Sequence, residues 1–260
     1  YAAICDTLRE ADFGAFARVL GDAGITKADD GLKHVSQDWA ITPLNNYHYT
    51  IYVPGNDAVQ PLLDSHQIPS SDDIDLINDC LNGANLNDSV AEERFGGLTE
   101  EEYLVAQAAQ MQLVITNFVT YHIQDNSVFL RGDSHNHDAF ESACLDTMTN
   151  RFYKLYVDYA PGGSLQVTDN MGNKRVVDEH CNNIMTRQYY FDGSNMVGTT
   201  VNDIYSSSYA VVHKINAVLV PNSDPYYKKE DWDKVQAILE AHKDEFRPTT
   251  NTSNPIKRKK

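Results

Sequence analysis

The sequence lacks basic residues relative to acidic ones, and it lacks the motifs of common enzymes. Its 260 residues include 37 acidic and 21 basic side chains, which gives a formal net charge of −16. A chain this acidic repels phosphate polymers, so the charge argues against a nucleic-acid partner. It contains no GxSxG, HExxH, P-loop or GxGxxG pattern. The sequence therefore predicts no catalytic residue and no cofactor.

Cysteines are few, and long apolar runs are missing. The four cysteines, Cys5, Cys80, Cys144 and Cys181, lie far apart without a CxxC pair, which argues against a structural zinc site. Three full disulfide pairings and four free thiols are all compatible with this spacing. No apolar run approaches the roughly 18 residues that a transmembrane helix needs. The chain opens within folded sequence, so we expect any targeting segment to precede residue 1.

The first half of the chain has mainly helical periodicity, and the second half alternates as strands do. Helical spacing predicts two short helices within residues 1–25, one at 69–83 and a long one from a Thr99–Glu102 capping box to His122. Strands are predicted at residues 49–53, 127–130, 152–158, 164–169, 174–178, near 184–191 and at 209–220. Trp232 to Phe246 marks a terminal helix, followed by a basic tail. This order predicts a single α+β domain.

Three segments, in this order, resemble the signatures of the fasciclin-like domain. They are TIYVPGNDAV (50–59), FVTYHI (118–123) and YAVVHKINAVLVP (209–221). Each is a short β-rich motif, and the three together in their strand and helix context carry the resemblance. It implies a wedge-shaped β-sandwich with surrounding helices over residues 1–221.

The chain departs from a minimal member of that family in two regions. Residues 64–98 read as a helical insertion, and residues 222–260 as a C-terminal helix and basic tail. The insertion, together with NNIMTRQYY at 182–190, resembles bacterial members from Bacteroidetes-type organisms more than animal ones.

The resemblance implies a non-enzymatic adhesion or recognition module. Such a module is exported to the outer membrane, cell surface or periplasm, belongs to a longer anchored protein, and binds a protein or polysaccharide partner there. Two alternatives come from other classes. One is a carbohydrate-processing accessory protein or hydrolase with an unrecognised acidic site, and the other is a structural spacer without a ligand.

Tyr121, His122 and His213 fall inside the matching segments. The resemblance implies that Tyr121 and His122 contact a receptor. The residues themselves favour a structural role, because His122 continues the apolar face of the long helix and His213 alternates with apolar residues along its strand. Buried histidines at such positions can hydrogen-bond backbone groups and hold a helix to a sheet.

Pro54, Asn56 and Asn216 complete the structural signature. Asn56 follows Pro54-Gly55 at the start of a helix, where capping of its own helix is favoured over ligand binding. Asn216 stands where the family usually has an acidic residue, which weakens any ligand inference there without disturbing the fold.

The stretch RGDSHNHD (131–138) offers two further candidate sites. Arg131, Gly132 and Asp133 form an Arg-Gly-Asp tripeptide in a polar loop, a secondary candidate for receptor contact. His135 and His137 are types of residue that bind metals, but a polar loop supplies ligand types without fixed geometry. The sequence therefore predicts no metal site.

Overall fold

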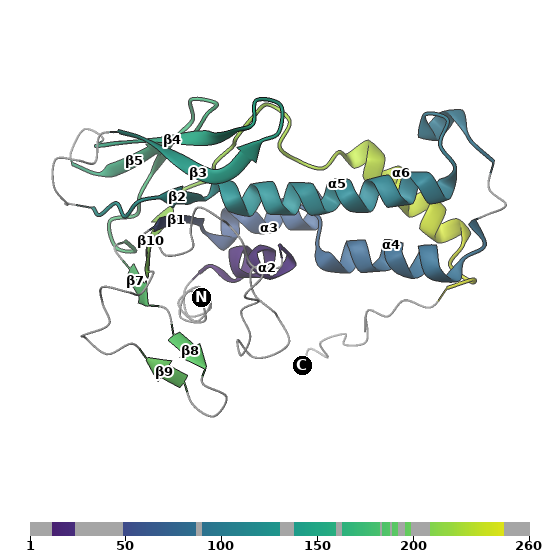
Figure 1. Ribbon diagram of the computed structural model, residues 1–260, viewed down its shortest axis with the longest axis horizontal. Coiled ribbons are helices and arrows are strands. Elements are labelled where there is room, and N and C mark those ends of the chain that lie inside the picture. Colours follow the sequence, from purple (N-terminus) through teal and green to yellow (C-terminus); the bar gives the residue numbers. More distant parts are fainter. Residues whose placement is uncertain are drawn as a thin grey trace, which may run out of the picture. The chain divides into compact units, whose positions relative to one another are not determined.

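The structure is a computed structural model that describes residues 12–23, 49–86, 90–130, 138–159, 163–182, 184–187, 189–191, 196–198 and 209–246. The chain divides into two compact units. The first unit contains the residues up to 64 and residues 115–225, and the second contains residues 65–114 and those from 226 on. The long helix α5, Glu100–Tyr121 (Figure 1), is continuous and contributes residues to both units.

The first unit is built on a mixed sheet of eight strands in the order β6-β5-β4-β3-β2-β1-β10-β7. All neighbouring pairs are antiparallel except β1 and β10, which are parallel. The strands are β1 Tyr49–Pro54, β2 Ile123–Asp125, β3 Asp138–Asp146, β4 Arg151–Tyr159, β5 Leu165–Thr168, β6 Lys174–Val176, β7 Ile184–Arg187 and β10 Tyr209–Ile215. Strands β8, Tyr189–Phe191, and β9, Met196–Gly198, form a separate two-stranded sheet. Helices together with this sheet confirm the predicted α+β class.

The first and third fasciclin-like segments contain the neighbouring strands β1 and β10, and the second ends helix α5 and begins β2 at Ile123. Strand β1 lies between β2 and β10, and all six of its residues are buried. A strand covered on both faces needs a continuous apolar sequence, which YTIYVP supplies.

The sheet also curls back on itself. Val177, directly after β6, forms an isolated antiparallel bridge with Ile215 at the end of β10. The Asn216 side chain strengthens this junction, because its oxygen accepts the backbone N–H of Val176 at 3.0 Å. The sheet is therefore nearly closed, and this end of β6 is paired.

Two short helices of the first unit pack against each other. Helix α2, Gly14–Asp22, buries Phe16, Val19 and Leu20, and helix α3, Asn56–Asp64, follows β1 directly. The Asn56 side-chain oxygen accepts the backbone N–H of Ala15 at 2.8 Å, at the start of α2. The prediction that Asn56 caps its own helix is therefore wrong. Its amide caps the neighbouring helix, whose N-cap Phe13 has no side chain that can do so.

The second unit consists of helices. These are α4 Ser71–Gly83, the short 3-10 helix η2 Glu93–Phe95, the first part of α5, and α6 Lys229–Ala241. Ser70 and Asp73 form a capping box at the start of α4, and Thr99 and Glu102 form the predicted one before α5. The core contains Ile77, Cys80, Leu86, Phe95, Tyr103, Leu104, Met111, Val114, Tyr227, Val235, Ile238, Leu239 and Phe246.

Gly83, at the end of α4, packs directly against Phe246 of this core. A Cβ added at Gly83 would lie 2.7 Å from the Phe246 Cβ and 3.1 Å from its Cα. Alanine normally stabilises a helix relative to glycine. At this position the steric overlap with Phe246 makes the substitution destabilising instead. We expect Gly83→Ala to destabilise the second unit by about 1–3 kcal/mol, measured by urea unfolding. Gly14→Ala is the control, because a Cβ at Gly14 meets nothing within 4 Å. Equal midpoints for both variants would contradict the prediction.

Candidate functional site

Tyr121 and His122, the centre of the second fasciclin-like segment, are both fully buried. His122 Nδ1 lies 2.7 Å from the carbonyl oxygen of Phe118. Its Nε2 accepts the backbone N–H of Leu219 at 3.0 Å. Because a backbone N–H only donates, Nε2 is the acceptor and Nδ1 carries the proton. Both nitrogens of a neutral imidazole are therefore used within the first unit.

The surroundings of His122 keep it neutral. Burial lowers its pKa to about 4, although the hydrogen bond to Phe118 acts in the opposite direction. The rings of Phe118 and Phe16 pack against the imidazole, with centroids at 4.6 and 5.5 Å. A buried, neutral histidine with both nitrogens engaged cannot accept a proton from a bound substrate.

His122 is one of four side chains that hold the segment 218–221, which begins three residues after the end of β10. Each of four consecutive residues has a backbone group bound by a side chain from elsewhere in the first unit. Arg175 Nε donates to the Val218 carbonyl at 2.7 Å, His122 accepts from Leu219, Asp169 accepts from Val220 at 3.0 Å, and Asn170 Nδ2 donates to the Pro221 carbonyl at 2.9 Å. We call these four side chains the 218–221 clamp. They replace the ladder hydrogen bonds that a strand would have made.

Asp169 accepts more hydrogen bonds than any other side chain of the clamp. Its side chain is 1% exposed, and it also accepts the backbone N–H groups of Met171 and Asn173 at 3.0 and 2.8 Å. The same carboxylate thus shapes the β5–β6 turn and fixes residue 220. The sequence interpretation placed strands at 164–169 and 174–178 and did not single out Asp169. The signal that it missed is an aspartate at the first position of a turn, where it can bind backbone groups locally.

The Tyr121 hydroxyl is buried and bonded within the first unit, which withdraws it from contact with a receptor. It donates to the Lys154 carbonyl at 3.1 Å and accepts the Asn170 N–H at 2.7 Å. Burial raises its pKa above the usual value for tyrosine. The hydroxyl therefore links α5 to β4 and to the clamp.

His213 on β10 is buried as well. Its Nε2 lies 2.7 Å from the Val128 carbonyl, and its ring stacks on Tyr52 of β1 at 6.0 Å between centroids. Burial lowers its pKa. Pro54 at the end of β1 is likewise buried, whereas Asn216 is exposed and forms the β6–β10 junction described above.

The Arg-Gly-Asp candidate, Arg131, Gly132 and Asp133, lies outside the described residues, as do His135 and His137. In the described part of the chain, no group of three or more His, Cys, Asp and Glu side chains could hold a metal ion. Cys80, Cys144 and Cys181 are free thiols, and Cys5 is not among the described residues. Burial raises the pKa of the Cys80 and Cys144 thiols to about 11, so both are poor nucleophiles.

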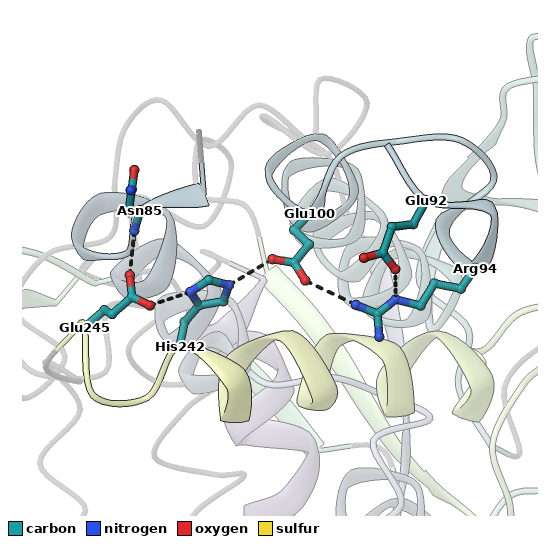
Figure 2. Close-up of polar contacts among 6 residues, drawn as sticks. All are labelled: Asn85, Glu92, Arg94, Glu100, His242 and Glu245. Carbon is teal, nitrogen blue, oxygen red and sulfur yellow. Dashed lines mark hydrogen bonds and ion pairs between the residues drawn. The ribbon is translucent and has the colours of Figure 1, made fainter. Parts of the chain in front are cut away.

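The second unit contains a charged cluster that the sequence interpretation did not identify. Figure 2 shows His242, at the C-cap of α6, between the carboxylates of Glu100 and Glu245. His242 Nε2 lies 2.8 Å from Glu100 Oε2, and Nδ1 lies 2.9 Å from Glu245 Oε1. The cluster consists of Asn85, Glu92, Arg94, Glu100, His242 and Glu245.

The outer parts of this cluster fix the two carboxylates. Arg94 donates to the other Glu100 oxygen at 3.2 Å and pairs with Glu92. The second Glu245 oxygen accepts the backbone N–H of Asn85 at 2.8 Å, directly after α4. The cluster therefore joins the ends of α4 and α6 to the start of α5 (Figure 2).

The chain has a weak similarity to a solved structure. Neither the protein-family models nor the curated proteins gave a match. Among solved structures, the chain is similar to a FAS1 domain pair from the insect cell adhesion molecule fasciclin I, with 14% identity and a TM-score of 0.32. The alignment covers 81% of this chain and 46% of that chain, so this chain spans about half the length of that structure. A TM-score this low establishes no common fold.

The described helices include none that is both long and apolar enough to cross a bilayer.

Proposed function

We propose that the chain is a non-enzymatic recognition module of the fasciclin-like family, exported and carried at a bacterial surface. The observation that carries this proposal is the convergence of the three family-like segments. The first and third segments contain the neighbouring strands β1 and β10, and the second ends helix α5 and begins β2. His122 of the second segment accepts the backbone N–H of Leu219 in the third. In this proposal the strands of the first unit correspond to the family's wedge-shaped β-sandwich, residues 1–221 to the domain, and residues 64–98 and 222–260 to additions.

Because Tyr121, His122 and His213 are buried, we expect recognition to use a different surface. On β4 and β5, Leu155, Val157, Leu165 and Val167 are buried, so the alternate side chains face outward. In the sheet register, Tyr156 lies beside Thr168, which lies beside Lys174. We define the outer β3–β6 face as Glu141, Lys154, Tyr156, Asp158, Gln166, Thr168, Lys174 and Val176.

The chemistry of this face suits a neutral polysaccharide. The Tyr156 side chain is 48% exposed, so its ring can stack on the apolar face of a sugar. Thr168 and Gln166 supply a hydroxyl and an amide beside it. Two acidic and two basic side chains balance on this face, although the whole chain has a net charge of −16. An uncharged glycan can therefore approach without the repulsion that an anionic polymer would meet.

The proposal predicts that Tyr156 is required for glycan binding. Neutral polysaccharide fragments on a glycan array would identify a ligand, and titration calorimetry would measure its affinity. We expect Tyr156→Ala to weaken binding about five- to thirtyfold, since loss of one stacked ring costs on the order of 1–2 kcal/mol. Val105→Ala is the matched control, because Val105 is an exposed apolar residue of the second unit.

Each other outcome of this experiment has a defined meaning. Unchanged affinity in Tyr156→Ala would exclude the outer β3–β6 face as the binding surface. Binding of proteins but not of glycans would exclude a polysaccharide as the partner. Hydrolysis of an array glycan, abolished by a single carboxylate substitution, would establish the hydrolase alternative. No binding at all would favour the alternative that the chain is a structural spacer without a ligand.

A further inference from the structure

Both ring nitrogens of His242 face carboxylates. A neutral imidazole has one N–H and therefore donates to one acceptor only. The contacts at 2.8 Å to Glu100 and 2.9 Å to Glu245 both need a donor, because an ionised carboxylate only accepts. The observed geometry is consequently that of an imidazolium. A neutral His242 would leave one carboxylate facing a lone pair.

The groups that face His242 come from every element packed around it. Glu100 is the nearly buried residue at the start of α5, and Glu245 follows α6. Arg94 and Glu92 lie on and before η2, behind Glu100. The Cys80 thiol of α4 is close enough to both carboxylates for their charges to raise its pKa, after burial as the larger cause. The cluster thus contains three carboxylates and one guanidinium, and His242 is the group in it that can supply a second positive charge.

We propose that His242 is a protonation-controlled clasp in the second unit, closed as the imidazolium and weakened as the neutral ring. Closed, it bonds the end of α6 to the start of α5 through Glu100. Through Glu245, it also bonds that end to the backbone after α4 at Asn85. Loss of one proton removes one of these two bonds. The end of α6 then loses either its His242 bond to Glu100 of α5 or the bond by which His242 fixes the Glu245 carboxylate.

The pKa of His242 changes in the direction that this geometry requires. Burial lowers it, but the hydrogen bonds to Glu100 and Glu245 outweigh burial, and the pKa is raised above its ordinary value. A histidine whose folded pKa is raised stabilises the fold fully below its unfolded pKa of about 6.5. That contribution is lost as the pH rises through the folded pKa. The clasp is therefore closed in mildly acidic solution and loosens in alkaline solution.

Hydrogen exchange of the full chain, followed at the α6 amides, tests the clasp. Protection factors, corrected for the intrinsic pH dependence of exchange, should fall by at least about threefold in the last turn of α6 between pH 6 and pH 9. In His242→Gln, which cannot carry a charge, they should not change over this range. His180→Gln serves as the control, because His180 is exposed and lies in the first unit.

Two results would overturn the proposal. One is pH-independent protection in the unmodified chain, and the other is the same pH dependence in His242→Gln. If His242→Gln does not fold, an NMR titration of the unmodified chain decides the matter. A His242 pKa at or below about 6.5 would exclude the clasp.

Discussion

Asp169→Ala is expected to be the most destabilising single substitution in the first unit, with a loss of about 3–5 kcal/mol. The carboxylate is buried, and its removal leaves the backbone N–H groups of Met171, Asn173 and Val220 without their acceptor. These groups lie in the β5–β6 turn and in the segment after β10, so both would lose their anchor. Chemical denaturation followed by circular dichroism would measure the change.

Two variants make the Asp169 result specific. Asp169→Asn keeps the shape and one oxygen, so an intermediate loss is expected. Asp138→Ala removes an exposed aspartate that, among the residues that the structure describes, bonds its neighbour's N–H, and it should change stability by less than about 0.5 kcal/mol. A loss for Asp169→Ala no larger than that of the exposed control would show that the clamp does not stabilise the fold.

His122→Ala is expected to cost about 2–4 kcal/mol and to lower the melting temperature by roughly 5–10 °C. The substitution leaves the Leu219 N–H and the Phe118 carbonyl without their partner and opens a cavity beside Phe16. An unchanged melting temperature combined with lost partner binding would instead establish His122 as a contact residue.

The pH dependence of His122 has the opposite sign to that of His242. Its pKa is lowered to about 4, so the unfolded chain binds a proton more readily than the folded one. The stability of the first unit should therefore decrease as the pH falls from about 6.5 to about 4. His122→Ala should lack this component in the same denaturation experiment.

The elements with strong local signals were predictable from sequence. The periodic apolar face of α5, its capping box, and strands β4, β5 and β6 were all found near their predicted positions. Strand β3 was missed, because its pairing with β4 shifts between Glu141 and Leu145 and this irregularity disrupts the alternation. Irregular pairing leaves no period-two signal in sequence.

Two segments that looked like strands are not strands, for a common reason. Residues 127–130 and 216–220 are rich in β-branched and apolar residues, yet side chains bind their backbone groups. Val128 donates to the Thr50 hydroxyl, and its carbonyl lies against His213. Residues 218–221 are held by the clamp. Apolar sequence predicts burial in both places, but it does not say whether a strand or a side chain satisfies the backbone.

Long-range polar contacts are the part of the candidate sites that could not be predicted from the sequence. The periodic positions of His122 and His213 predicted that both are buried. They did not predict which groups the two histidines hydrogen-bond. Asn56 bonds Ala15 across 41 residues, and His242 bonds Glu100 across 142 residues. No local pattern in the sequence marks either pair, because each depends on the tertiary fold.

The parallel pairing of β1 with β10 has a consequence for how the chain folds. Tyr49 pairs with Ala210, so this strand pair cannot form until residues 209–215 have been synthesised. Non-local contacts of this kind raise the contact order and slow folding, because a large loop must close first. During that interval β1, with its apolar sequence, has no permanent neighbour on its β10 side. The nascent first unit is therefore expected to depend on protection from aggregation until β10 arrives.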